Sequence, residues 1–558
     1  MFPIPFPFEF RPRLLDYWRQ YTAADFRADL AAGITVGVVA LPLAMAFGIA
    51  SGVRPEQGIV TAIVAGFLIS ALGGSRVQIG GPAGAFVALL YAIAEKYGVA
   101  NLLIATSMAG VLLFAMGVAR LGNLVRFVPV SIIAGFTTGI AVIVGLSQVK
   151  DFLGLPVAKL PANFFSQIAV LGGAIVKVNL HALVIGASSL LVIVLWPVAY
   201  QANTQRWRRI TAKLPSTLVV LMVWSALVPW LGWPVETIGS RFGGLPSGLP
   251  APAMPHFDWE TAKYLVAPTL AIAFLGAIES LLCARVADGM IEDRHDPNQE
   301  LMAQGIANFF TPFFVGIAAT GTIARTVTNV RSGARSPVAG LVHALTLLAI
   351  ILLAAPYAAH VPMAALAAIL LWVAYSMGDW SQFRKLGQYT VFYRTTFLAT
   401  FFMTVVFDLI VAVETGLVLA SLFFILRISS LTRVDDIALD PAQARRADGK
   451  RVEAYRLFGS LFFGSVTKIE FLIDPHRALP DVLILEMSKL INIDTTGLEA
   501  IEALHARLAR AGGELHLAGA NEQPRDIMQR SGLLARLGEA CVHADLAGAL
   551  AAGNQRAV

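Results

Sequence analysis

The sequence has little charge and almost no cysteine. Only 14% of its 558 residues are Asp, Glu, Lys or Arg, whereas soluble domains carry about 25%. The two cysteines, Cys283 and Cys541, lie in segments of different character, so we predict neither a disulfide nor a metal site. Basic residues do not cluster with aromatic ones as on nucleic-acid-binding surfaces. With no set of catalytic or metal-ligating side chains, the sequence predicts a protein that is not an enzyme, uses no cofactor and binds no nucleic acid.

Long apolar stretches are what the sequence has in abundance, since 57% of its residues are hydrophobic. About fourteen stretches have the composition of membrane-spanning elements, and several are shorter than the roughly 20 residues of a full span. They cover residues 30–50, 59–72, 73–90, 102–118, 130–148, 182–200, 217–233, 265–284, 301–314, 320–329, 338–355, 363–373, 396–407 and 410–426.

Basic loops predict the orientation of the chain in the membrane. Lys and Arg are enriched in cytoplasmic loops, and here they follow the even-numbered segments, most densely at Arg206, Arg208, Arg209 and Lys213. A cytoplasmic N-terminus explains this alternation, and an even number of spans returns the C-terminus to the same side. We therefore expect a multi-pass protein of a bacterial-type inner (plasma) membrane with both termini in the cytoplasm.

Two of the apolar segments are interrupted by glycine and polar residues. Residues 320–329 read T-G-T-I-A-R-T-V-T-N, and residues 80–85 read G-G-P-A-G-A, where Pro82 suits the first turn of a helix. These segments are the third and the tenth of about fourteen, so each is the third segment of its half. Each half has seven spans, and because seven is odd, the two halves insert into the membrane with opposite orientation. The pattern predicts a 7+7 inverted repeat with two half-helices whose positive N-terminal ends meet at the middle of the membrane.

The end of the chain has the composition of a soluble domain. Residues 454–463, 482–486 and 514–518 read as strands, and residues 498–511 and 527–536 read as amphipathic helices. Strands that alternate with helices predict a small α/β domain. We expect a cytoplasmic N-terminal segment (1–29), a transmembrane domain (30–430), a linker (431–453) and this α/β domain (454–558).

Several motifs resemble those of the SulP (sulfate permease) family of anion transporters. They are L-P-L-A-M-A-F-G around Pro42, G-G-P-A-G-A, G-A-I-E-S-L-L at 276–282, G-I-A-N at 305–308 and T-I-A-R-T-V-T-N. In the tail, L-F-G-S-L-F-F-G-S at 457–465 and I-D-T-T-G-L at 493–498 resemble a STAS domain. The resemblance covers nearly the whole chain. It implies secondary active transport of anions, core and gate domains that move as an elevator, and a homodimer.

Arg325 and Glu279 are the two ionisable residues that we single out within the apolar half of the chain. An arginine at membrane depth is rare and faces the protein interior or a watery cavity. Arg325 is a candidate to hold the anion, although it could instead bond to carbonyls of a broken helix. Glu279 is a candidate for proton coupling, and a buried salt bridge with Arg325 is the alternative. The resemblance favours protons, because proton-coupled members have Glu and Arg at these positions and the sodium-coupled bicarbonate branch does not.

The remaining candidates for anion binding surround the two half-helix starts. Backbone N–H groups at Ala83, Gly84 and Ala324 are suited to bind an anion, although small residues there could also serve helix packing. Phe47 is a candidate wall of the pocket. Thr326 is a candidate ligand that could equally bond within its own helix.

The sequence predicts proton-coupled uptake of sulfate or a related oxyanion. Bicarbonate and C4-dicarboxylates such as fumarate or succinate remain alternatives, and a membrane sensor that signals through its tail is the competing class. In the tail, Asp494 suits a helix N-cap, and the neighbouring Thr495 lies where some STAS proteins are phosphorylated.

Overall fold

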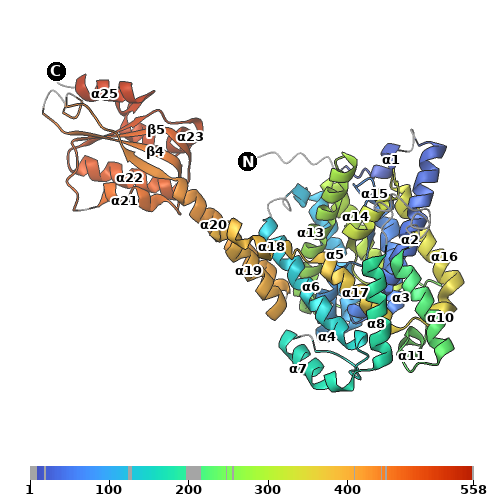
Figure 1. The fold of residues 1–558 in the computed structure, drawn as a ribbon. Coiled ribbons are helices and arrows are strands. Elements are labelled where there is room, and N and C mark those ends of the chain that lie inside the picture. Colours follow the sequence, from blue (N-terminus) through green and yellow to red (C-terminus); the bar gives the residue numbers. More distant parts are fainter. Residues whose placement is uncertain are drawn as a thin grey trace. The chain divides into compact units, whose positions relative to one another are not determined.

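The computed structural model describes residues 9–17, 21–123, 129–161, 163–196, 215–246, 248–253, 257–407, 409–441, 443–445, 449–474 and 476–555. The chain divides into two compact units, Met1–Leu417 and Val418–Val558 (Figure 1). The first unit is helical and the second contains the larger sheet. The basic loop at Arg206, Arg208, Arg209 and Lys213, on which the predicted orientation depends most, lies outside the described residues.

Each of the predicted apolar segments corresponds to a helix. In the first half these are α2 (Ala23–Ala50), α3 (Pro55–Leu72), α4 (Gly84–Tyr97), α5 (Val99–Val118), α6 (Val130–Phe152), α8 (Leu180–Leu195) and α10 (Ser216–Leu231). In the second half they are α13 (Val266–Ile291), α14 (Pro297–Phe310), α15 (Ile323–Arg331), α16 (Val338–Ala358), α17 (Met363–Met377), α19 (Val391–Val406) and α20 (Leu409–Leu431). The short helices α1 (Arg13–Tyr17), α7 (Phe164–Ala174), α11 (Ile238–Phe242), α12 (Trp259–Tyr264) and α18 (Ser381–Lys385) lie between or before them.

Not every helix is long enough to cross a membrane by itself. Among the described residues, 7 helices have the length and apolarity of a span. Residues 164–177 and α8, bent by 114°, would add an eighth if the two together form one broken span. The third element of each half is short: α4 has 14 residues and α15 has 9, against about 20 for a full span. Both are therefore half-helices, as the interrupted sequences predict.

Helix packing relates the two halves to each other. The helix α5 packs on α14, and in the same way α16 packs on α3. Likewise α6 packs on α19 as α17 packs on α8, and α2 packs on α16 as α13 packs on α5. If each helix is replaced by its counterpart in the other half, each of these contacts becomes the other contact of its pair. This is the arrangement of an internal repeat. We call α2–α5 with α13–α16 the core, and α6, α8, α10, α17 and α19 the gate.

The first long helix begins earlier than the hydrophobicity indicates. We assigned residues 1–29 to a cytoplasmic N-terminal segment, but α2 starts at Ala23 because Thr22 and Asp25 form a reciprocal capping box there. Asp29 also lies inside α2 and is fully buried, where its carboxylate accepts hydrogen bonds from Tyr21, Arg335 and Ser336. Local capping and a buried polar network extend the helix beyond the apolar stretch.

The second unit contains a five-stranded sheet of order β3-β4-β5-β6-β7. Its strands are β3 (Arg433–Asp436), β4 (Val452–Leu461), β5 (Val482–Ile493), β6 (Glu514–Ala518) and β7 (Val542–His543). The edge strand β3 is antiparallel to β4, and the other pairs are parallel.

Helices cover both faces of this sheet (Figure 1). They are α21 (Glu470–Ile473), α22 (Thr495–Arg510), α23 (Glu522–Arg530), α24 (Leu533–Leu537) and α25 (Leu546–Gln555). Asp494 caps α22, as predicted, by accepting a hydrogen bond of 2.8 Å from the Gly497 N–H. Residues 433–436, which we assigned to the linker, form the edge strand.

Candidate functional site

The two half-helices start from one small antiparallel pairing inside the core. Strand β1 (Gly80–Gly81) pairs with β2 (Thr320–Gly321), with Gly80 opposite Gly321 and Gly81 opposite Thr320. The helix α4 begins three residues after β1, and α15 begins two residues after β2. Two helix N-termini, each with unpaired backbone N–H groups and a partial positive charge, therefore lie at one crossing.

The hydroxyl groups of two threonines hold this crossing together. The Thr326 Oγ1 accepts a hydrogen bond of 2.9 Å from the backbone N–H of Ile79 and one of 3.2 Å from the Cys283 thiol. Thr322 donates from its backbone N–H and its Oγ1 to the Ile79 carbonyl, both at 2.9 Å. The half-helix α15 is thus fixed to the segment that precedes α4, and every one of these groups belongs to the core.

Arg325 lies inside the crossing and is 1% exposed. Its Nη2 donates a hydrogen bond of 2.6 Å to the carbonyl of Pro82, at the start of α4. Among the described residues, its Nε and Nη1 have no hydrogen-bond partner. The guanidinium therefore joins the half-helix α15 to the start of α4. This is the carbonyl-bonded arrangement that the sequence analysis gave as the alternative to anion binding. The Nε and Nη1 donors can still bind a ligand.

The backbone position beside Arg325 requires glycine, and Gly81 occupies it. Its φ is +149°, a backbone conformation that side chains disfavour, and a β-carbon there would lie 2.5 Å from the Arg325 Nη1.

Glu279 is buried on the face of α13 that meets the crossing. Gly276 and Cys283, one turn before and one turn after it, both contact that crossing: Thr320 donates to the Gly276 carbonyl at 3.1 Å, and Cys283 bonds to Thr326. Among the described residues, Glu279 and Arg325 form no ion pair within 4.0 Å. The carboxyl group is therefore near the crossing without being neutralised by the arginine.

Phe47 and a gate residue cover the first turn of α4. A β-carbon on Gly84 would lie 3.3 Å from the Phe47 ring and 2.9 Å from the Met377 sulfur. Ala83 and Gly84 are consequently buried, whereas Ala324 at the start of α15 is exposed. Met377, at the end of α17, is the gate contact that our reading of the sequence missed, because it ends an ordinary apolar helix and carries no local signal.

His343 is a second residue near the crossing. From the sequence we interpreted it as an interfacial or packed residue, with a proton-relay role as the alternative. It is fully buried on α16, and among the described residues neither ring nitrogen has a hydrogen-bond partner. A β-carbon on Gly66 would lie 3.5 Å from its ring and 3.1 Å from the Gly80 carbonyl. The only feature of the sequence that could have drawn attention to His343 is that it is a single histidine in an otherwise apolar helix.

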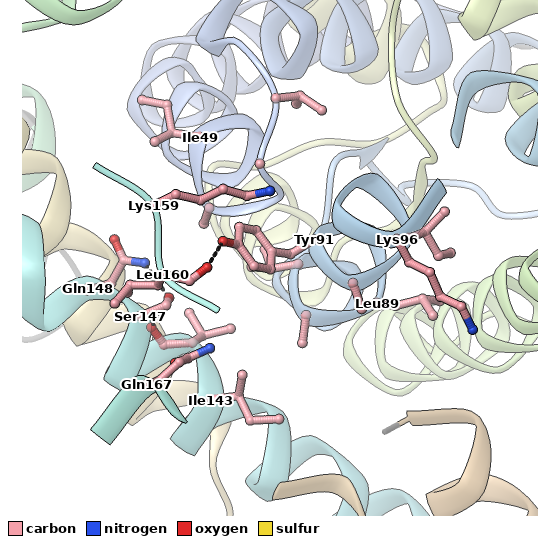
Figure 2. A pocket seen from close by; sticks show the side chains of 18 of the residues that line it. Ile49, Leu89, Tyr91, Lys96, Ile143, Ser147, Gln148, Lys159, Leu160 and Gln167 are labelled. Atoms are coloured by element: carbon pink, nitrogen blue, oxygen red, sulfur yellow. Dashed lines mark hydrogen bonds between the residues drawn. The ribbon is translucent and has the colours of Figure 1, made fainter. Parts of the chain in front are cut away.

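A cavity of 870 Å³ lies elsewhere between core and gate (Figure 2). It is lined at the C-terminal ends of α2, α4 and α6, and the predicted anion-binding residues and Glu279 are absent from its described lining.

Comparison with known proteins agrees with this architecture. The sulfate permease family model matches residues 26–400, and a STAS domain model matches residues 447–546. The putative sulfate transporter YvdB of Bacillus subtilis is 40% identical over 94% of this chain and 97% of its own length. The bicarbonate transporter BicA of Picosynechococcus is 28% identical over 92% of each chain.

A solved structure has the same fold over nearly the whole chain. The murine anion transporter Slc26a9 superposes with a TM-score of 0.82 over 97% of this chain and 93% of its own, at 18% sequence identity. The paired half-helices, the exchangeable helix contacts and the C-terminal sheet thus belong to a known architecture. The chain belongs to the sulfate permease family and carries a C-terminal STAS domain.

Proposed function

We propose that this chain is a secondary active transporter that takes up a small oxyanion, with sulfate as its substrate. The single observation that carries the proposal is the crossing, where two helix N-termini and a buried arginine concentrate positive charge. Such ends bind anions through backbone N–H groups, and a guanidinium adds donors that match an oxyanion. In this proposal Ala83, Gly84 and Ala324 provide backbone contacts, Arg325 provides charge, Phe47 forms a wall, and Thr326 completes the site.

We further propose that the anion moves with the core. The hydrogen bonds that hold the crossing join core segments to one another, so the site can move as a rigid unit. The gate contributes Met377 over α4, a van der Waals contact that sliding can break at little expense. An elevator motion of core against gate would then expose the site alternately to the two sides of the membrane.

Glu279 is the proposed proton-coupling group. It is buried on the α13 face that meets the crossing and has no ion pair with Arg325 among the described residues. A carboxylate there would repel a bound anion, and protonation removes that repulsion. One proton would therefore accompany the anion.

Bicarbonate is the second candidate substrate. The relative BicA, named as a bicarbonate transporter, aligns over 92% of this chain. Backbone N–H groups and one guanidinium suit either oxyanion. C4-dicarboxylates such as fumarate or succinate, which the sequence analysis named as alternative substrates, are the third candidate.

The membrane arrangement also belongs to this proposal. We place the protein in a bacterial-type inner membrane with both termini in the cytoplasm, as a homodimer, on the loop charges and the family resemblance. The proposed domains are residues 1–29, 30–430, 431–453 and 454–558.

The test is radiolabelled sulfate uptake into proteoliposomes, with and without an inward proton gradient. Wild type should take up sulfate faster with the gradient, and Glu279→Gln should take it up at a rate that the gradient does not change. Transport of bicarbonate or fumarate without sulfate would refute the substrate. Absence of any flux in reconstituted, folded protein would refute the transport function and favour a sensor.

A further inference from the structure

The cavity between core and gate has positively charged walls. The described lining residues that carry charge are five basic and one acidic: Arg54, Lys96, Lys150, Lys159, Arg241 and Asp151. Asp151 is neutralised by Arg241 at 2.9 Å. Two of the other cations pair with carboxylates that are absent from the described lining, Lys159 with Glu95 at 3.9 Å and Arg54 with Glu56. Arg241 also lies 3.6 Å from Glu236, another carboxylate that is absent from the described lining. The described lining itself has more basic than acidic side chains, a balance that favours anions over cations.

Lys150 is a buried cation of this cavity. It is 8% exposed, and its ammonium donates to two neutral groups, the carbonyls of Val157 (3.4 Å) and Ala158 (3.2 Å). Among the described residues no carboxylate lies within 4.0 Å of it, and the neighbouring Asp151 pairs with Arg241. Burying a charge without an opposite charge is unfavourable. An anion in the cavity would supply the missing partner and a stronger, charge-assisted bond.

A buried amide on the same wall points to a polar ligand as well. Gln167 of α7 is 3% exposed and lines the cavity, yet its Oε1 has no hydrogen-bond partner among the described residues. Ser147 and Gln148 of α6 are bonded to each other at 2.7 Å beside it, and Figure 2 shows the three side chains together on one wall. An amide turned by half a rotation offers its NH₂ in place of its oxygen, so Gln167 can donate to an anion.

A short loop lines the cavity between core and gate. Residues 157–160, which we call the strap, follow α6 and are held to α6 by Lys150 and to α7 by packing of Leu160 with Leu171. From the core, the Tyr91 hydroxyl donates to the Leu160 carbonyl (Figure 2), and Glu95 pairs with Lys159 of the strap. Any sliding of core against gate must break these two ties.

We propose that this cavity is a second anion-binding site, a vestibule in which Lys150 and Gln167 hold a small oxyanion and which the strap closes. The identity of the anion and the side that it comes from rest on the proposed function. The chemical class, a small oxyanion with several acceptor oxygens, follows from one ammonium and the amide and hydroxyl groups beside it. The vestibule would collect anions on the non-cytoplasmic side before they reach the crossing.

The experiment uses the full-length protein with Ser147→Cys, because the two native cysteines are buried. The reaction rate of the introduced thiol is measured with a sulfonate-bearing and an ammonium-bearing methanethiosulfonate, with unsubstituted protein as the blank. Each rate is divided by the rate of the same reagent with a small free thiol, because the two reagents differ in intrinsic reactivity. On this scale we expect the anionic reagent to react at least about threefold faster than the cationic one, and sulfate to slow the reaction more than chloride of equal ionic strength. Adding Lys150→Gln, which keeps a donor for the strap carbonyls, should abolish both effects, whereas Lys150→Arg should keep them.

Three results would overturn the proposal. They are a rate ratio near one, a ratio that Lys150→Gln leaves unchanged, and sulfate protection no greater than that of chloride. None of these readouts needs transport. If the introduced thiol shows the expected preference and protection while wild type moves no anion, the vestibule stands and the proposed transport function fails.

A role of the strap itself is tested with Tyr91→Cys and Leu160→Cys in one chain. Joining the two thiols with a bifunctional methanethiosulfonate about as long as the tyrosine side chain should stop sulfate uptake, and reduction should restore it, because the cross-link ties the core to the strap. The single variants Tyr91→Cys and Leu160→Cys, which cannot be cross-linked in this way, should take up sulfate at a rate that the reagent does not change. Full uptake by the cross-linked Tyr91→Cys, Leu160→Cys protein, with the cross-link verified by mass spectrometry, would show that the strap is not a closure.

Discussion

Replacing Thr326 by valine separates a structural role of this residue from direct anion binding. The substitution keeps the shape of the side chain and removes its oxygen. The Ile79 N–H, which is fully buried, then loses the acceptor at 2.9 Å. A buried donor left without a partner costs about 1–3 kcal/mol. This cost lowers the ratio of molecules in which α15 stays bound to the Ile79 segment to molecules in which this contact is broken by about 5- to 150-fold.

Two neighbouring substitutions serve as controls. Thr326→Ser keeps the acceptor and should behave like wild type apart from a lost methyl group. Thr322→Val removes one of the two donors to the Ile79 carbonyl, which still receives the Thr322 N–H. Its effect should therefore be the smaller loss of one ordinary hydrogen bond, about 0.5–1.5 kcal/mol.

The assay combines thermal stability in detergent with initial rates of sulfate uptake. Thr326→Val should lower both the midpoint of thermal denaturation and the maximal uptake rate, in the order Thr326→Val, Thr322→Val, Thr326→Ser. A Thr326→Val protein as stable as wild type, with only a raised KM for sulfate, would refute the structural reasoning and make this threonine a direct ligand.

Three further predictions test other parts of the structure. Gly84→Val should nearly abolish uptake, because its β-carbon would lie 2.9 Å from the Met377 sulfur, and adding Met377→Ala should restore part of the initial rate; no rescue would contradict the contact. Asp29→Ala should destabilise the protein by about 3 kcal/mol or more, since it leaves the buried donors of Arg335 and Ser336 unpaired, and a wild-type yield of folded protein in fluorescence-detected size exclusion would contradict this. In the STAS domain, burial raises the pKa of Glu486, but hydrogen bonds from Ser488 and Arg456 outweigh it and hold the pKa below 4.5. The ionised form is therefore stabilised by folding, so Glu486→Gln should lower thermal stability at pH 7 and lose that deficit as the pH falls below 4.5; a deficit of equal size at both pH values would contradict the linkage.

The architecture could be predicted from sequence because it depends on local composition. Apolar stretches, glycine interruptions and loop charges indicate helices, half-helices and their order without any knowledge of packing. The start of α2 could not be placed in this way, because Asp29 is stabilised inside the helix by donors from Tyr21, Arg335 and Ser336, two of them about 300 residues away along the chain.

The candidate site could be predicted only in part. Residue types and positions pointed to Arg325 and Glu279, since ionisable groups at membrane depth are unusual. Which groups they contact could not be predicted, because the Arg325 bond to Pro82 spans the two halves of the chain. Met377 and His343 are ordinary residues of apolar helices, and only the packing of the core and the gate brings them near the crossing.

The central claim is that an anion binds at the crossing beside Arg325. The measurement that tests it most directly is equilibrium binding of radiolabelled sulfate to the purified full-length protein, compared between wild type, Arg325→Lys and Arg325→Met, with folding checked by size exclusion. We predict saturable binding to wild type that weakens with ionic strength, weaker binding to Arg325→Lys, and at least about tenfold weaker binding to Arg325→Met, since a lost charge-assisted hydrogen bond is worth about 1.5–3 kcal/mol. A folded Arg325→Met protein that binds sulfate with wild-type affinity would contradict the claim.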